Sequence, residues 1–134
     1  MQDEYVSAFY DVVQETRQHT GIELPETIEH YVVVLLASHI DKSNFLPSHS
    51  FAKSFLQLKR ASDAKTLGDT CLFVTGIFPD YGIDINYYSN IGKTSYSTAA
   101  NTLNGELFST LSVHFDIVRD FINCIPNKRD KYLV

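Results

Sequence analysis

Apolar residues recur at helical spacing through most of this 134-residue chain, and this pattern constrains the fold more than any other feature. The clearest case is the segment from Leu107 to Ile125, where apolar side chains stand three and four positions apart until Pro126 ends the pattern. This spacing puts them on one face of a helix, and that face must be buried against other helices. No alternating strand pattern accompanies it, so the sequence predicts an all-α fold.

Short turns divide the chain into several segments of this kind. The expected helices cover about residues 3–20, 25–40, 51–62, 64–78, 85–103 and 107–125. Asp63 and Asp84 stand where N-cap carboxylates are expected. A single long helix over 51–78 is also possible, and the alternative is a break at Ser62-Asp63. We adopt the break. The prediction is a single domain, residues 1–134, built as a bundle of five to six helices with a loose tail at about 127–134.

The second segment leaves an alternative open. Residues from Tyr31 to Ala37 are apolar all round and rich in β-branched side chains, which suits a buried strand as well as a buried central helix. We prefer the helix, because no partner strand is found elsewhere in the chain. Pro25 then stands at the first helical position.

Composition and termini favour a soluble, cytoplasmic protein. Hydrophobic residues make up 44% and charged residues 20%, which is typical of a globular domain and argues against disorder. The N-terminus is acidic, unlike a secretory signal, and the run from Tyr31 to Ala37 is too short for a membrane span. The two cysteines, Cys71 and Cys124, exclude a disulfide scaffold, and we expect reduced thiols in the core.

Charge is distributed unevenly along the chain. The net charge of −5 argues against a general nucleic-acid binder. Residues 1–30 carry seven acidic side chains against Arg17, whereas residues 42–65 carry five basic side chains against Asp63. The simpler interpretation is two solvated faces that attract each other weakly within one fold. The alternative is a pair of complementary faces for self-association, as in a homodimer.

Three glycines interrupt otherwise strong helical patterns between residues 64 and 103. Each costs roughly 0.5–1 kcal/mol relative to alanine, so each is expected to permit a close approach. Several tyrosines lie near them. One interpretation is a tight helix crossing with tyrosine rings packed over the glycines; the other is a groove that admits a flat or apolar ligand. The residues of this candidate groove are Gly68, Asp69, Gly76, Tyr87, Tyr88, Gly92 and Tyr96.

Asp69 is the charged residue of most interest, since it lies in a helix that is expected to be buried. A buried carboxylate must be hydrogen-bonded or paired. We expect a hydroxyl of Tyr87, Tyr88 or Tyr96 to donate to it, or Arg119 to pair with it. Two interpretations of Asp69 are open: it belongs to a structural polar network, or it is a functional carboxylate with a raised pKa.

Two blocks of this segment carry a resemblance to a known family. They are Leu67-Gly68-Asp69-x-x-Leu72-Phe73-x-x-Gly76-x-Phe78 and Asp84-x-x-Tyr87-Tyr88-x-x-x-Gly92-x-x-x-Tyr96. Together they resemble a family of small, uncharacterised bacterial helical proteins, and they span about 40 of the 134 residues. The resemblance implies a bacterial origin and a helical fold. It supplies no activity, cofactor or catalytic residue.

Catalytic and metal-binding motifs are weak throughout. Glu26 and His30 can offer two ligands from one helix face, but no HExxH or ExxH pair completes a metal site. No GxSxG is found, so we predict no catalytic residue, metal or cofactor. The expected function is a non-catalytic binding or protein-interaction module. Its alternatives are a carrier of a small apolar or aromatic ligand in the Tyr/Gly groove, and an enzyme that uses Asp69 and the nearby tyrosines.

Overall fold

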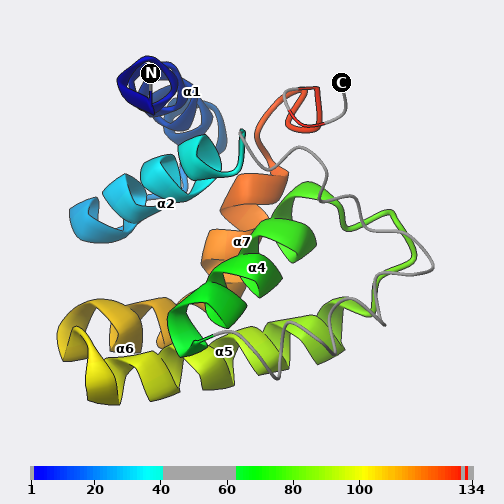
Figure 1. Ribbon diagram of the computed structural model, residues 1–134. Coiled ribbons are helices and arrows are strands. Elements are labelled where there is room, and N and C mark those ends of the chain that lie inside the picture. The colour runs from blue at the N-terminus through cyan, green and yellow to red at the C-terminus, as the bar shows by residue number, and fades with distance from the viewer. Residues whose placement is uncertain (1, 41–62, 131, 133–134) are drawn as a thin grey trace.

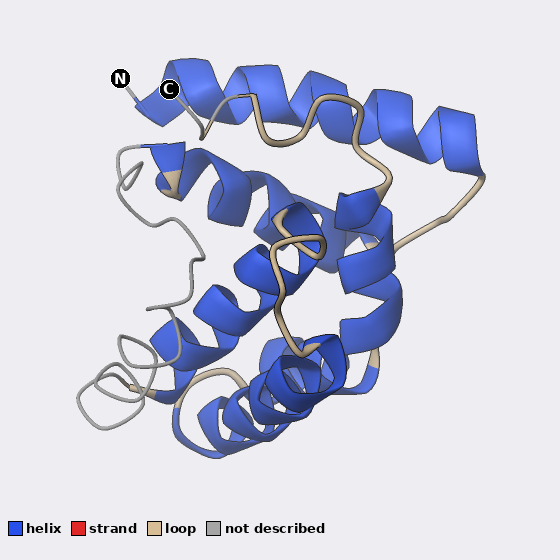
Figure 2. Cartoon of the chain, turned by 90° about the vertical axis from the view of Figure 1, so that its right-hand side faces the viewer, coloured by secondary structure: helices blue, strands red, loops and turns tan. Residues whose placement is uncertain are grey.

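The computed structural model describes residues 2–40, 63–130 and 132, with side chains from residue 4 onward. These residues form a compact bundle of six helices (Figure 1) and contain no strand (Figure 2), which confirms the all-α prediction. The helices are α1 (Gln2–Thr20), α2 (Glu26–Ser38), α4 (Ala64–Ile77), α5 (Ile85–Thr102), α6 (Gly105–Val113) and α7 (Phe115–Asn123). The helix expected over 51–62 lies outside the described residues.

Side-chain caps fix where three of the helices begin. In each, an Asp or Asn accepts a hydrogen bond from the backbone N–H three residues later, a donor that the helix leaves without a partner. The pairs are Asp63 with Thr66 (2.7 Å), Asp84 with Tyr87 (3.0 Å) and Asn104 with Leu107 (3.1 Å). The predicted helix starts after Asp63 and Asp84 are therefore confirmed.

The second segment is a helix, as preferred, but it is not buried all round. Val34 is 43% exposed while its neighbour Val33 is 1% exposed. Pro25 occupies the N-cap position, one residue before the predicted place. The helix that is buried along its length is α4, where every residue from Leu67 to Ile77 is buried. It packs chiefly on α5 and α7, and Figure 1 shows it in the middle of the bundle.

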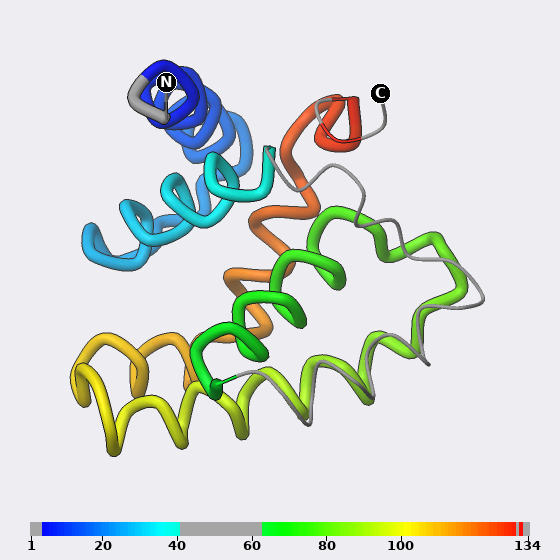
Figure 3. The backbone as a smooth tube through the Cα atoms, viewed as in Figure 1, coloured from blue at the N-terminus to red at the C-terminus, as the bar shows by residue number. Residues whose placement is uncertain are grey.

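The prediction of one helix over 107–125 is wrong. The chain breaks at His114, where φ is −100° and ψ is 15°, and α7 leaves in a new direction (Figure 3). Contacts with α5 hold both sides of this break. The hydroxyl of Ser112 donates to the carbonyl of Lys93 at 2.8 Å, and the ring of Phe115 lies against Gly92. No local glycine or proline marks the break, so tertiary contacts override the helical pattern here.

The described part of the tail is held against the bundle, and residues 131, 133 and 134 of the predicted loose tail lie outside the described residues. Tyr132 is 3% exposed, and its hydroxyl donates to the carbonyl of Leu36 at 2.9 Å. Its ring contacts Phe73 with a centroid distance of 4.9 Å. Arg129 donates to the carbonyl of Ile77 at 3.2 Å. The buried ring and these two bonds tie the tail to α2 and α4.

Three further expectations concern membrane spans, the two cysteines and the charge pattern. No helix in the described ranges is long and apolar enough to cross a membrane. Cys71 is buried as expected, but Cys124 is exposed, because it follows the end of α7 rather than facing the core. Of the five basic residues in 42–65, only Lys65 is described, so the basic half of the charge pattern lies outside the described residues.

Candidate functional site

A carboxylate with three donors lies between α2, α4 and α5. Asp69 is 9% exposed. Its Oδ1 accepts hydrogen bonds from the hydroxyls of Tyr31 at 2.6 Å and Tyr96 at 2.7 Å. Its Oδ2 accepts from Nζ of Lys65 at 2.9 Å. We call these four residues the Asp69 cluster. Both carboxylate oxygens are satisfied, which offsets the cost of burying the charge.

The glycine before Asp69 makes the cluster possible. A Cβ on Gly68 would lie 2.7 Å from two ring atoms of Tyr96. Because that Cβ is absent, the Tyr96 ring can lie directly against α4 and its hydroxyl can reach the carboxylate. Tyr31 arrives from α2, and its ring meets the edge of Tyr96 at a centroid distance of 6.4 Å. The cluster therefore ties three helices to one carboxylate.

The two tyrosines of the cluster are held as neutral donors. Burial raises the pKa of Tyr31 above the ordinary value of 10.0, and the negative charge of Asp69 raises it further. Tyr96 is fully buried, and the same two causes, burial first, raise the pKa of its hydroxyl well above 10.0. Both hydroxyls therefore keep their protons at neutral pH and donate hydrogen bonds to Asp69.

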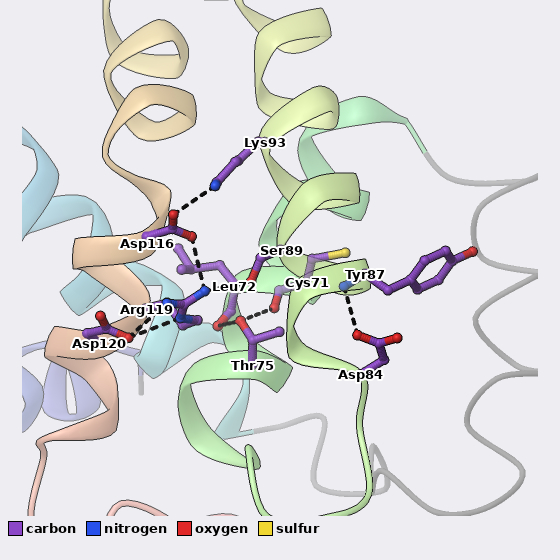
Figure 4. A network of polar contacts seen from close by, with 10 residues as sticks. All are labelled: Cys71, Leu72, Thr75, Asp84, Tyr87, Ser89, Lys93, Asp116, Arg119 and Asp120. Atoms are coloured by element: carbon purple, nitrogen blue, oxygen red, sulfur yellow. Dashed lines mark hydrogen bonds and ion pairs between the residues drawn. The ribbon is translucent and has the colours of Figure 1, made fainter.

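Of the four alternative partners predicted for Asp69, Tyr96 is confirmed, and the other three lie elsewhere. Tyr96 donates as expected. Tyr87 is 47% exposed, and in Figure 4 its ring points away from the polar network. The ring of Tyr88 packs edge-on against Tyr87, with centroids 5.1 Å apart. Arg119 is engaged elsewhere: it donates to Ser89 at 2.9 Å and forms ion pairs with two neighbouring aspartates (Figure 4).

Sequence reasoning missed two members of the cluster. Lys65 had a usable signal, because it stands four residues before Asp69 and side chains at that spacing meet on a helix. Tyr31 had none, since it lies 38 residues away on another helix.

The protein's own side chains fill the space over the other two glycines as well. A Cβ on Gly76 would lie 2.8 Å from Ile122, and one on Gly92 would lie 2.6 Å from Cζ of Phe115. The glycines permit close helix packing, as the first of the two interpretations expects, but a tyrosine ring lies only over Gly68. Open space remains beside these helices: a pocket of about 520 Å³ between α4 and α5 is lined by Tyr87 among others, and a larger one lies beside Tyr31.

A pocket of about 690 Å³ lies between the start of α2 and α6, and we call it the α2–α6 pocket. Its size is in the range typical of small-molecule sites, about 300–1,000 Å³. Its lining residues are Pro25, Glu26, Thr27, His30, Tyr31, Asn104, Glu106, Leu107 and Thr110. Tyr31 is shared with the Asp69 cluster. Glu26 and His30 both line the pocket, but no group of three potential metal ligands occurs among the described residues.

The tie made by Asp69 can be tested directly. Asp69→Asn is expected to lower the free energy of unfolding by about 2 kcal/mol, measured by urea denaturation. The asparagine oxygen still accepts from both tyrosines, but its NH₂ group faces the Lys65 ammonium, so two donors meet. Asp116→Asn is the matched control, because Asp116 is an ion-paired aspartate like Asp69 but its side chain is 53% exposed. We expect a loss of under about 1 kcal/mol there. A variant at residue 69 as stable as the parent would contradict the structural role.

Comparison of the chain with protein-family models, with curated proteins and with solved structures gave no match in any of the three. The family resemblance of the two sequence blocks therefore stays a prediction. The geometry of the described residues is what supports a function.

Proposed function

We propose that this chain is a binding module and that it holds a small aromatic ligand in the α2–α6 pocket. The observation that carries the proposal is the pocket of about 690 Å³ beside a tyrosine fixed in place. Core side chains lie over all three glycines of the groove first expected, so we place the proposed site beside Tyr31 instead. Tyr31 links this pocket to the Asp69 cluster.

The walls of the pocket suit an aromatic ring. Pro25, Leu107 and the ring of Tyr31 offer apolar surface. The Tyr31 ring is restrained on several sides. It meets the edges of Tyr96 and Phe108, with centroids 6.4 Å and 5.9 Å away, and its hydroxyl is bound to Asp69. A wall that is already ordered loses little freedom when a ligand stacks on it, which favours affinity.

Polar groups at the rim give such a ligand an orientation. The hydroxyl of Thr110 donates to the carbonyl of Glu106 at 2.8 Å, which leaves its oxygen able to accept a hydrogen bond. Thr27 lies in the first turn of α2, where backbone N–H groups have no partner inside the helix. His30 adds a ring nitrogen. A few polar groups around an apolar wall are typical of small-molecule sites.

Asp69 supports binding rather than catalysis. Three donors occupy its two oxygens, and the pocket is lined by Tyr31 and not by Asp69. A general base needs an acceptor within reach of the substrate proton. The carboxylate instead positions the Tyr31 ring, so we assign Asp69 a positioning role.

The proposal predicts saturable binding of aromatic fragments. In a screen of fluorinated aromatic fragments by ¹⁹F NMR, we expect hits whose affinity falls by at least about tenfold in Thr27→Phe. Thr27 is exposed at the pocket wall, so the larger side chain fills the pocket without entering the core. Native mass spectrometry of freshly purified protein gives an independent test of a bound molecule.

Gln18→Phe is the matched control for this experiment. Gln18 is exposed on α1 and does not line the pocket, so the added ring should leave fragment affinity unchanged. Fragments that bind equally well to the parent and to Thr27→Phe would place binding elsewhere. A screen without any saturable hit would remove the proposal.

Self-association, the protein-interaction form of binding, stays a prediction. Light scattering after size exclusion at several concentrations tests it, and a strict monomer at high concentration would argue against it.

A further inference from the structure

A second pocket carries a buried acceptor without a donor. Glu29 lies on α2 and is 7% exposed. Its Oε1 accepts a hydrogen bond from Nε2 of Gln14 on α1 at 2.5 Å. Its Oε2 is buried and has no hydrogen-bond partner among the described residues. Nη1 of Arg17 forms an ion pair with it at 3.8 Å, which is beyond hydrogen-bond distance. An unsatisfied buried carboxylate oxygen is costly, so a partner is expected for it.

The surroundings of Glu29 are open enough to admit that partner. A pocket of about 370 Å³ lies between α1 and α2, and we call it the α1–α2 pocket. Its lining residues are Tyr10, Gln14, Arg17, Glu23, Leu24, Glu26, Glu29 and His30. The set holds three carboxylates against one guanidinium and one histidine, so the pocket has an excess of negative charge.

We propose that the α1–α2 pocket binds a small organic cation whose primary ammonium group donates a hydrogen bond to Oε2 of Glu29. The empty acceptor requires a donor, and the excess of carboxylates favours a positive one. Tyr10 adds an aromatic ring, 52% exposed, beside the carboxylates. A ring face attracts an organic cation.

Arg17 is the group that the ligand must displace. Its side chain is 45% exposed, and its distance of 3.8 Å from Glu29 is that of a loose ion pair. Exposed pairs of this kind contribute little, so moving the guanidinium aside costs little. An anionic ligand would use Arg17 as its anchor but would stand among the carboxylates of Glu23, Glu26 and Glu29. The two ligand classes therefore predict opposite effects of removing Arg17.

Calorimetric titration with n-butylammonium chloride at low ionic strength tests this proposal. We expect saturable binding, and tetramethylammonium, which has the charge but no N–H donor, should bind at least about tenfold more weakly. Glu29→Gln should weaken n-butylammonium by about tenfold or more. Arg17→Gln should strengthen it by about threefold or more, since the competing cation is gone.

Matched variants separate the pocket from the overall charge. Glu15→Gln removes a carboxylate from an exposed position on α1, and Lys93→Gln removes a cation from α5. Both should change the affinity by less than about twofold. Tyr10→Ala, at an exposed ring, offers a test that does not depend on Glu29→Gln folding, and we expect about threefold weaker binding.

The proposal is overturned by any of three results. They are equal binding of tetramethylammonium, weaker binding in Arg17→Gln, or no saturable binding to the parent protein at millimolar concentration. Thr27→Phe, the variant for the α2–α6 pocket, should leave n-butylammonium affinity unchanged, so the two proposals fail independently.

Discussion

Gly92→Ala is expected to lower the free energy of unfolding by about 3 kcal/mol, although alanine is the better helix former. The added Cβ would lie 2.6 Å from Cζ of Phe115 and 3.1 Å from Cβ of Cys71. Neither neighbour has room to move, because Phe115 is 0% exposed and Cys71 is 1% exposed. Phe115 also begins α7, so its displacement would shift that helix against α5. Urea denaturation measures the loss.

Ser97 provides the control on the same helix. Ser97 is exposed on α5, and Ser97→Ala should be more stable than Ser97→Gly by about 1 kcal/mol, which is the ordinary preference for alanine. If glycine is instead the more stable residue at position 92, the reversed stability difference between alanine and glycine reports packing alone. Phe115→Leu in the Gly92→Ala background should recover part of the loss, because the smaller side chain vacates the clash. A Gly92→Ala protein at least as stable as the parent would show that the core yields at this position.

The helices whose starts were predicted correctly are those that a neighbouring residue in the sequence caps. Asp63 and Asp84 begin their helices because a carboxylate two or three residues before an N–H can cap it wherever the rest of the fold lies. The break at His114 is different. It depends on Ser112 and Phe115 meeting α5, and neither contact leaves a mark in the helical pattern. Periodicity continues across the break, so the sequence alone predicts one helix.

The residues of the candidate site also differ in whether a local sequence pattern identifies them. Gly68 and Asp69 stand out in the sequence because both break the rule for a buried helix. Their partner Tyr96 fits the pattern of tyrosines that follows. Tyr31 does not, because it stands inside an apolar run, where a ring is expected only to fill the core. Its role follows from the packing of α2 on α4, which no local pattern encodes.

Glu29 shows the limit of a local interpretation most clearly. In the sequence it is one of two acidic residues in the first turn of a helix, where a carboxylate is favourable to the helix dipole. That interpretation predicts an exposed side chain. The packing of α1 buries it instead, leaving one oxygen bound to Gln14 and the other without a donor. The same helix α2 therefore presents Tyr31 to one proposed pocket and Glu29 to the other.

Alkaline pH is expected to destabilise this protein steeply: the free energy of unfolding starts to fall near pH 10, and the slope approaches about 4 kcal/mol per pH unit above about pH 11. Burial raises the pKa of Tyr31, Tyr96 and Tyr132 above their ordinary value of 10.0 in the folded protein. Above pH 10 the unfolded chain releases these three protons while the folded chain keeps them. The unfolded state then binds fewer protons, so the free energy of unfolding falls as pH rises. Below the ordinary value the full stability is present.

Two variants and one spectroscopic signal test this slope. Urea denaturation between neutral and strongly alkaline pH gives the free energy of unfolding against pH. The slope of that curve gives the number of protons that the chain releases on unfolding. Tyr132→Phe should reduce the slope by about a third, and it also loses the bond to the carbonyl of Leu36, which costs about 1 kcal/mol at neutral pH. Tyr10→Phe replaces a ring that is 52% exposed and should leave the slope unchanged.

Tyrosinate absorbance distinguishes this mechanism from general charge repulsion. If the buried hydroxyls keep their protons until the chain unfolds, part of the absorbance change must coincide with the loss of helical circular dichroism. Repulsion among the acidic residues would instead lower stability without any shared transition, and added salt would reverse it. A folded protein that shows full tyrosine ionisation would contradict the burial of Tyr96, and with it the donor role that fixes Asp69 between the three helices.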